Sequence, residues 1–291
     1  MLLKTHKEQN ELNQEEINER MLEDSLAYKG YEHVRHKVPF VYTAKKEKLE
    51  TLYFGTGHTN CFEDHMIASI HGTFASFNPD TLFVEGMRQV ASRQYMEQLC
   101  RTDGRTLVSQ YGENAYAAAI GYQKGMKLHS PEPDPNEESL FILKRGFDKM
   151  DILLFYMLQF VNQWLRSAPD AHLDTYIVKG LEYLAADMNW PVASAAQIYA
   201  YAERRYSIDV ASLSSDDCLQ MTDPIDRLSS QNGCFGILNQ IARLSSVCRD
   251  IRLLRAIDSI ASERRRLMIV YGATHAYVQK PALEKIGFTC S

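Results

Sequence analysis

Two copies of a Gly-x-x-His motif are the residues in this chain best suited to chemistry. The first, GTGH at 55–58, follows the apolar run TLYF, and the second, GATH at 272–275, follows LMIVY. Residues just beyond the carboxyl ends of strands in an open α/β sheet converge on the crevice where ligands bind, so the two histidines can meet although they lie far apart in the chain. Alternatively, each glycine only permits a tight turn and each histidine caps a helix. Two copies after matched strands favour a shared site.

A carboxylate and a guanidinium follow a third apolar run. TLFV leads into Glu85 and Gly86, and Arg88 comes three residues after Glu85. A strand-end carboxylate can bind a metal or act as a general base, whereas a surface salt bridge is the alternative. Two histidines and a carboxylate match a catalytic metal site with three protein ligands and an open position for water. We therefore expect a divalent ion such as zinc, manganese or cobalt at His58, His275 and Glu85.

These motifs, taken in chain order, resemble those of the Tiki/TraB superfamily. That group includes pheromone-shutdown proteins, Tiki-type metalloproteases, erythromycin esterases and haem-uptake proteins. The likeness rests on GTGH, VEG-x-R, a helix containing GENAYAAA, the pair Arg249-Asp250 and the closing VYGATH, and it covers roughly residues 50–135 and 236–288. Gly86 departs from the pattern, since many members have a more polar residue there. The substrate class therefore does not follow from the likeness.

The resemblance implies a shared α/β core and roles for further residues. Glu85 and Arg88 match the superfamily's Glu-x-x-Arg, and Arg249 matches an arginine on the helix before the last strand. Glu113 and Glu132 match acidic positions more loosely. The candidate site residues are Glu85, Glu113, Arg88 and Arg249 for catalysis, His58, His275 and Glu85 for metal binding, and Gly55, Gly57, Gly272 and Glu132 for substrate binding.

The resulting hypothesis is a metal-dependent hydrolase of a peptide or ester. The ion lowers the pKa of its water, and Glu113 or Glu85 takes the proton. Arg88 or Arg249 stabilises the oxyanion, or binds a carboxylate or phosphate of the substrate. A metal-free variant uses the two motif histidines as acid and base. Two alternatives belong to other classes: a protein that binds haem or another small ligand in the same pocket, and a catalytically degenerate protein that acts on a partner.

Composition and charge narrow the class of function. The chain has 291 residues, a net charge of -5 and 45% hydrophobic residues, so nothing indicates nucleic-acid binding and we expect a small-molecule or peptide partner. Six scattered cysteines without a C-x-x-C pair predict reduced thiols and a cytoplasmic location. The polar start does not resemble a secretory signal, and the longest apolar stretch, 152–158, is too short to span a membrane.

The elements that must position the motifs follow from apolar runs and helical periodicity. We expect short strands at TLYF, TLFV, MKLH and LMIVY, and helices at 62–77, at 87–100, from about 113 to Gly125, at 237–262 and from 275 to near Gly287. The predicted fold is α/β, with a mostly parallel sheet and flanking helices built from two sequence-distant parts, plus an all-helical insertion.

Composition also predicts the domain boundaries. A polar, helical N-terminal arm covers 1–45, with Leu12, Ile17, Met21 and Leu26 at helical spacing, and we expect it to be solvated. The core covers 46–138 and 236–291, and the helical insertion covers 139–235. The proline-rich stretch SPEPDPNEES at 130–139 should be a loop that no helix crosses. The arm or the insertion could mediate a homo-oligomer.

Other charged residues have plainer interpretations. The run Glu263 to Arg266 precedes a strand and is interpreted as a solvated turn, with phosphate binding as the alternative. His71 and His129 are interpreted as structural.

Overall fold

The chain forms two compact units. The computed structural model describes residues 18–29, 31, 34–167, 172–188, 190, 193–224 and 236–291. The first unit comprises Met1–Glu132 with Asp250–Ser291, and the second comprises Pro133–Arg249. The second unit thus extends beyond the predicted insertion at 139–235. It does so because it includes all of a helix that begins within the proline-rich stretch, and the first part of a long helix that continues into the first unit.

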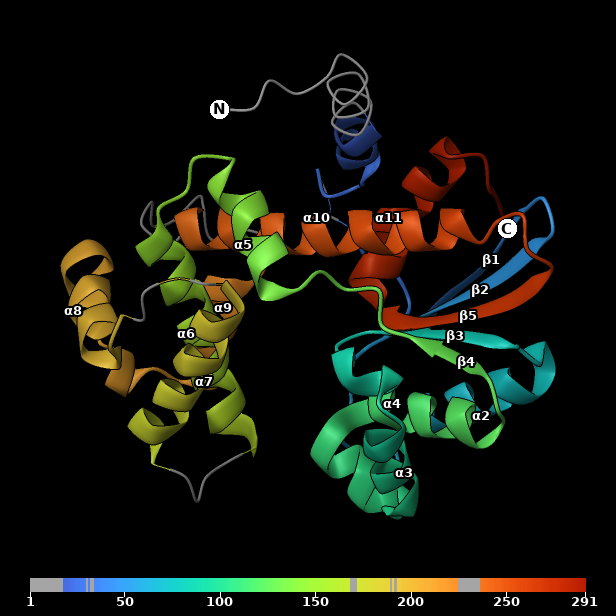
Figure 1. Cartoon of the computed structure of the whole chain (residues 1–291), viewed down its shortest axis with the longest axis horizontal. Helices are drawn as coiled ribbons and strands as arrows, with labels where there is room; N and C mark the ends of the chain where they lie inside the picture. Colours follow the sequence, from blue (N-terminus) through green and yellow to red (C-terminus); the bar gives the residue numbers. More distant parts are fainter. Residues whose placement is uncertain are drawn as a thin grey trace, which may run out of the picture. The chain divides into compact units, whose positions relative to one another are not determined.

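One mixed sheet organises the first unit (Figure 1). Its strands are β1 (Phe40–Lys46), β2 (Leu49–Thr56), β3 (Thr81–Val84), β4 (Lys127–His129), β5 (Arg265–Gly272) and β6 (Thr289–Cys290). They are arranged in the order β4-β3-β5-β2-β1-β6, in which the first four are parallel and β1 pairs antiparallel with β2 and β6. The predicted α/β fold with a mostly parallel sheet is confirmed.

Strand alternation sends side chains to the two faces of the sheet. On one face, Phe54, Leu82 and Val270 share a core with side chains of the helices α2 (His65–Phe77), α3 (Arg93–Arg101) and α4 (Gly104–Gln123). Figure 1 shows these three helices together on one side of β3 and β4. On the other face, the buried Tyr53 hydrogen-bonds Gln279 of α11 (Ala273–Lys285). The two-sided burial explains why the central strands contain long apolar runs.

Side-chain caps start α2, α3 and α4. Asp64 accepts a hydrogen bond from the backbone N–H of Met66 and begins α2, three residues later than the periodicity predicts. The helix predicted at 87–100 is instead a short 3-10 helix, η2 (Arg88–Ala91), followed by α3. Ser92 separates the two because its side chain caps the N-terminus of α3.

Residues 18–25 of the N-terminal arm are helical, as predicted, but the prediction is wrong in two other respects. Residues 40–46 form β1 and are not helical, and burial alternates along the strand, with Tyr42 and Ala44 buried and Val41 and Lys45 exposed. The described part of the arm is also part of the core, since Leu22, Leu26 and Tyr28 are all buried. Leu12 and Ile17, which carried part of the helical pattern, lie outside the described residues.

The second unit is helical throughout its described residues, as predicted. It contains α5 (Pro135–Leu143), α6 (Lys149–Ser167), α7 (Leu173–Met188), α8 (Ala195–Tyr206), the 3-10 helix η3 (Val210–Ser212), α9 (Ser215–Thr222) and the beginning of α10 (Gly236–Ser259). Its apolar core encloses a buried Asp151, whose carboxylate accepts hydrogen bonds from the hydroxyls of Tyr201 and Tyr206.

The proline-rich stretch marks the boundary between the units, but it does not exclude a helix. Asp134 caps α5, and Pro135 occupies the first turn. Proline is tolerated there because the first N–H groups of a helix have no intrahelical partner. None of the helices in the described ranges has the length and apolar character needed to cross a membrane.

Close packing of α11 on β2 makes Gly55 a sensitive position for stability. A Cβ at Gly55 would lie 2.8 Å from the Cβ of Ala276 and 2.9 Å from both the Cα of Ala273 and the carbonyl oxygen of Phe40. We expect Gly55→Ala to lower the free energy of unfolding by about 1 to 3 kcal/mol, the usual cost of overpacking. Urea denaturation of both proteins measures this difference in the free energy of unfolding.

The matched control for this prediction is Gly72→Ala in α2. A Cβ at Gly72 meets no atom within 4 Å, so this substitution should be neutral or stabilising. Equal urea midpoints for the Gly55→Ala variant and the wild-type protein would show that the interface between β2 and α11 has more room than these distances indicate.

Candidate functional site

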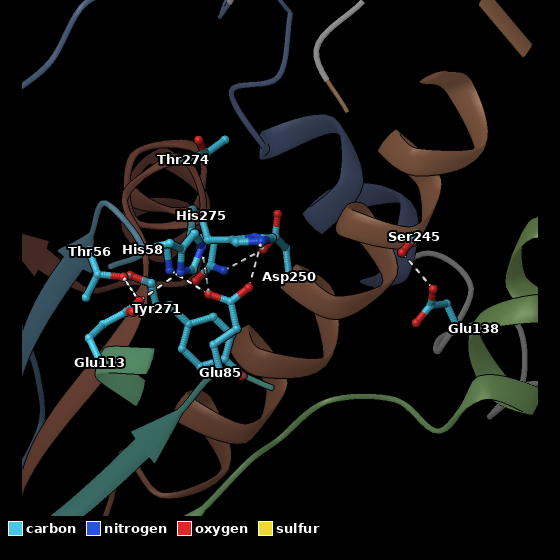
Figure 2. A network of polar contacts seen from close by, with 12 residues as sticks. Thr56, His58, Glu85, Glu113, Glu138, Ser245, Asp250, Tyr271, Thr274 and His275 are labelled. Atoms are coloured by element: carbon cyan, nitrogen blue, oxygen red, sulfur yellow. Dashed lines mark hydrogen bonds and ion pairs between the residues drawn. The ribbon is translucent and has the colours of Figure 1, made fainter. Parts of the chain in front are cut away.

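The carboxyl ends of three adjacent parallel strands bring the motif residues together. In the strand order, β5 lies between β3 and β2, and the register pairs Val84 with Val270 and Thr56 with Gly272. Glu85, His58 and His275 follow the ends of β3, β2 and β5. Glu85 Oε1 lies 3.6 Å from Nε2 of His275, and Glu85 Oε2 lies 4.0 Å from Nε2 of His58. One carboxylate therefore faces both imidazoles (Figure 2).

The first imidazole is held by a carboxylate behind it. Nδ1 of His58 lies 2.8 Å from Oε1 of Glu113, which also accepts the hydroxyl of Thr56 at 2.9 Å. The other oxygen of Glu113 accepts the backbone N–H of Thr59 at 3.0 Å. An ionised carboxylate only accepts hydrogen bonds, so Nδ1 of His58 is the donor and Nε2 is the atom directed at Glu85.

Glu113 is buried and fully engaged in this network. Burial raises the pKa of its carboxyl, but the hydrogen bond and charge of His58 and the N–H of Thr59 outweigh it, so the pKa lies below its ordinary value. Gly112, with a φ of 77°, interrupts α4 immediately before Glu113. A residue with a side chain rarely adopts this conformation, so the glycine allows the change of direction at Glu113.

The second imidazole is held by a carboxylate that is completely buried. Nδ1 of His275 lies 2.6 Å from Oδ1 of Asp250, which also accepts the side-chain amide of Gln279 at 2.6 Å. The hydroxyl of Tyr28 donates to Oδ2 of Asp250 at 2.6 Å. Tyr53 in turn donates to the side-chain oxygen of Gln279, which fixes the orientation of that amide. His275 therefore also donates through Nδ1 and directs Nε2 towards Glu85.

Glu85 is fixed by the backbone of the second motif. The N–H of Gly272 donates to Oε2 of Glu85 at 2.6 Å, and both groups are buried. A Cβ at Gly272 would lie 2.9 Å from Nε2 of His58 and 3.4 Å from Oε2 of Glu85. Only glycine leaves the space between these two groups open. This gives a direct reason for the glycine of the second motif.

The imidazoles differ in their access to solvent. The side chain of His58 is 56% exposed, whereas that of His275 is only 10% exposed. His58 has a φ of 44°, in the left-handed region, and follows the exposed Gly57. The site therefore opens on the side of His58 and is closed behind His275.

Other predicted site residues lie apart from this cluster or keep untested roles. Arg88 lies in η2 and lines a separate cavity. Gly55 is enclosed by Phe40, Ala273 and Ala276, so packing alone accounts for it. The remaining three stay predictions: Gly57 packs against Val38, Glu132 lies three residues beyond β4, and Arg249 is the last residue of the second unit.

Sequence reasoning missed the residues that orient the second imidazole. Asp250 appeared only within a family motif and received no role, and Tyr28 lay in a segment expected to be solvated. The sequence did contain one indication that Asp250 is buried. It interrupts an apolar side of α10 formed by Val247, Ile251 and Leu254. A carboxylate in that position needs a buried partner.

The cluster offers the donors of a metal site, although it is not assembled as one. Neutral imidazole Nε2 atoms and a carboxylate are ligands that zinc and similar ions accept. Within the described ranges, no group of three or more His, Cys, Asp and Glu side chains has the geometry to hold an ion as it stands.

Comparisons with protein-family models, with curated proteins and with solved structures find no match to the chain.

Proposed function

We propose that the first unit is a hydrolase of a peptide or ester that activates water with a divalent ion held by His58, Glu85 and His275. One observation carries this proposal. Each imidazole is bound through Nδ1 to a carboxylate and turns Nε2 to the same Glu85. This is the arrangement in which outer carboxylates orient histidine ligands and increase their basicity.

The donor set fits such an ion with a small adjustment. Two ligands on a tetrahedral ion, with bonds of about 2.0 to 2.2 Å, lie about 3.4 Å apart. Oε1 of Glu85 lies 3.6 Å from Nε2 of His275, and Oε2 of Glu85 lies 4.0 Å from Nε2 of His58. His58 is the farther and the more exposed ligand, so it has room to move closer.

Each residue of the cluster has its own role in the proposed reaction. A bound ion lowers the pKa of a water molecule and polarises the carbonyl of the substrate. Glu113 and Asp250 keep both imidazoles in one tautomer. Glu85 is the proton acceptor, because Glu113 is committed to His58 and Thr59 and does not reach the open side. The resemblance to the Tiki/TraB superfamily supports the same assignment for His58, Glu85 and His275.

Metal analysis of the full-length protein tests the proposal. After dialysis against a chelator, the wild-type protein should regain zinc, manganese or cobalt in titration calorimetry, together with hydrolysis of chromogenic esters or fluorogenic peptides. His58→Ala and His275→Ala should lose both properties. The control is His71→Ala, which removes an exposed histidine on α2.

The outcomes separate the alternatives. Hydrolysis that depends on both histidines without any bound metal would establish the metal-free acid and base mechanism instead. Metal content and hydrolysis that are the same in all variants would refute the proposal. A Soret band that forms with added haem and disappears in His58→Ala would favour the ligand-binding alternative.

A further inference from the structure

A second cavity lies on the first unit, at the edge of the sheet formed by β3 and β4. It has a volume of about 470 Å³, and its walls come from these strands, η2, the end of α10 and the beginning of β5. Small-molecule sites typically have about 300 to 1,000 Å³. None of His58, Glu85 and His275 lines this cavity. It is therefore distinct from the candidate hydrolase site.

Three cationic side chains from three different elements line the cavity. They are Arg88 of η2, Lys127 of β4 and Arg265 of β5. Arg265 is already paired, with Glu263 at 2.9 Å and Asp80 at 3.8 Å. Arg88 and Lys127 have no carboxylate within 4.0 Å among the described residues. The cavity thus carries two positive charges without partners, on a chain whose net charge is -5.

Glu263, which pairs with Arg265, also lines the cavity, and the other side chains of the wall are apolar or neutral. Phe83, Leu128 and Ile260 line the cavity, and the ring of His129 packs edge-on against Phe83 at 5.4 Å between centroids. Burial and the charge of Lys127 hold the pKa of His129 below its ordinary value, so its imidazole is neutral at pH 7. These side chains can contact an apolar group next to the cations.

Hydroxyl groups complete the wall. Oγ of Ser130 accepts the backbone N–H of Met87 at 3.2 Å, which leaves the hydroxyl proton of Ser130 available to a ligand. Ser259 also lines the cavity, but its hydroxyl donates to the carbonyl oxygen of Ala256 at 2.8 Å. Two cations and a hydroxyl donor within one half-open cavity are the groups that recognise a phosphate.

We propose that this cavity binds a small phosphate monoester, with the phosphate between Arg88 and Lys127 and the organic group against Phe83. A phosphate monoester is largely a dianion at pH 7, since its second pKa is about 6. Its charge therefore matches the two unpaired cations better than the single charge of a carboxylate. The inference does not depend on the proposed hydrolase, because the two sites share no residue.

Titration calorimetry with phenyl phosphate tests the proposal on the full-length protein. Phenyl phosphate should bind, benzoate should bind more weakly, and benzyl alcohol should not bind measurably. Arg88→Gln and Lys127→Gln should each weaken phenyl phosphate binding about 10- to 100-fold, the usual effect of losing a charge-assisted contact. Lys124→Gln is the control, because Lys124 is exposed at the end of α4 outside the cavity.

The binding measurements can either support or overturn the proposed phosphate site. Arg88 and Lys127 are exposed and lie on different elements, so their substitution should leave the thermal unfolding midpoint unchanged. A parallel loss of binding in both variants, with Lys124→Gln unaffected, would locate the phosphate in this cavity. The proposal is overturned if phenyl phosphate does not bind, if both variants bind it as the wild-type protein does, or if benzoate binds equally well.

Discussion

Replacing Glu85 by glutamine is expected to lower kcat/KM for the hydrolysed substrate by about 100- to 10,000-fold, the range that a positioned general base contributes. Glu85 is the carboxylate that both Nε2 atoms face, and it is buried at the end of β3. Glutamine has the same shape and keeps an oxygen that can accept the N–H of Gly272. The substitution therefore removes the charge and the proton acceptor while the local fold remains.

Several measurements make this result specific. Metal content should fall together with activity, because an amide is a weaker ligand than a carboxylate for a divalent ion. The thermal unfolding midpoint should change little. Glu97→Gln is the matched control, since Glu97 is an exposed glutamate that pairs with Arg93 on α3. Wild-type kinetics in Glu85→Gln would remove Glu85 from the mechanism and leave the histidines to act as acid and base.

The central part of the fold could be predicted from the sequence because its signals are local. The strands β2, β3 and β5 are buried on both faces, so they contain apolar runs that end at a glycine or an acidic residue. The strand β1 has its apolar stretch, FVY, only at its start. Its sequence FVYTAKK alternates between buried and exposed positions and contains two lysines, which made it resemble the polar arm. The antiparallel pairing of β1 with β2 and β6 was therefore missed.

The candidate site likewise has one part that could be predicted from the sequence and one part that could not. The meeting of His58, Glu85 and His275 follows from a general property of parallel sheets, in which the carboxyl ends of adjacent strands lie side by side. The partners of the imidazoles do not follow from that property. Tyr28 and Asp250 are 222 positions apart, and their contact depends on how the N-terminal segment packs against α10. No periodicity within either segment encodes that packing.

Asparagine in place of Asp250 is expected to reduce activity by about 100- to 10,000-fold with the fold intact. Outer partners of metal-binding histidines are typically worth about 10- to 100-fold, and loss of the correct histidine tautomer in a catalytic triad costs about 10,000-fold. Asp250 accepts three hydrogen bonds, from His275, Gln279 and Tyr28. Asparagine has only one oxygen, so its amide NH2 must face either Tyr28, which donates to Oδ2, or both His275 and Gln279, which donate to Oδ1.

The orientation of that amide decides the size of the effect. If it faces His275 and Gln279, the proton of His275 moves to Nε2, and His275 can no longer present a lone pair towards Glu85. If it faces the hydroxyl of Tyr28, which can rotate to accept, only the negative charge behind His275 is lost. Tyr28→Phe removes one donor and keeps that charge, so its effect on activity should be a few-fold.

The order of the variants tests the role of the buried carboxylate. Activity should fall from the wild-type protein through Tyr28→Phe to Asp250→Asn, measured as kcat/KM and as metal affinity. The control is Asp258→Asn, which changes an exposed aspartate on the same helix that pairs with Lys46. If Asp250→Asn and Asp258→Asn behave alike, Asp250 serves only to satisfy buried donors. If the graded loss is found, the N-terminal segment contributes directly to the orientation of His275.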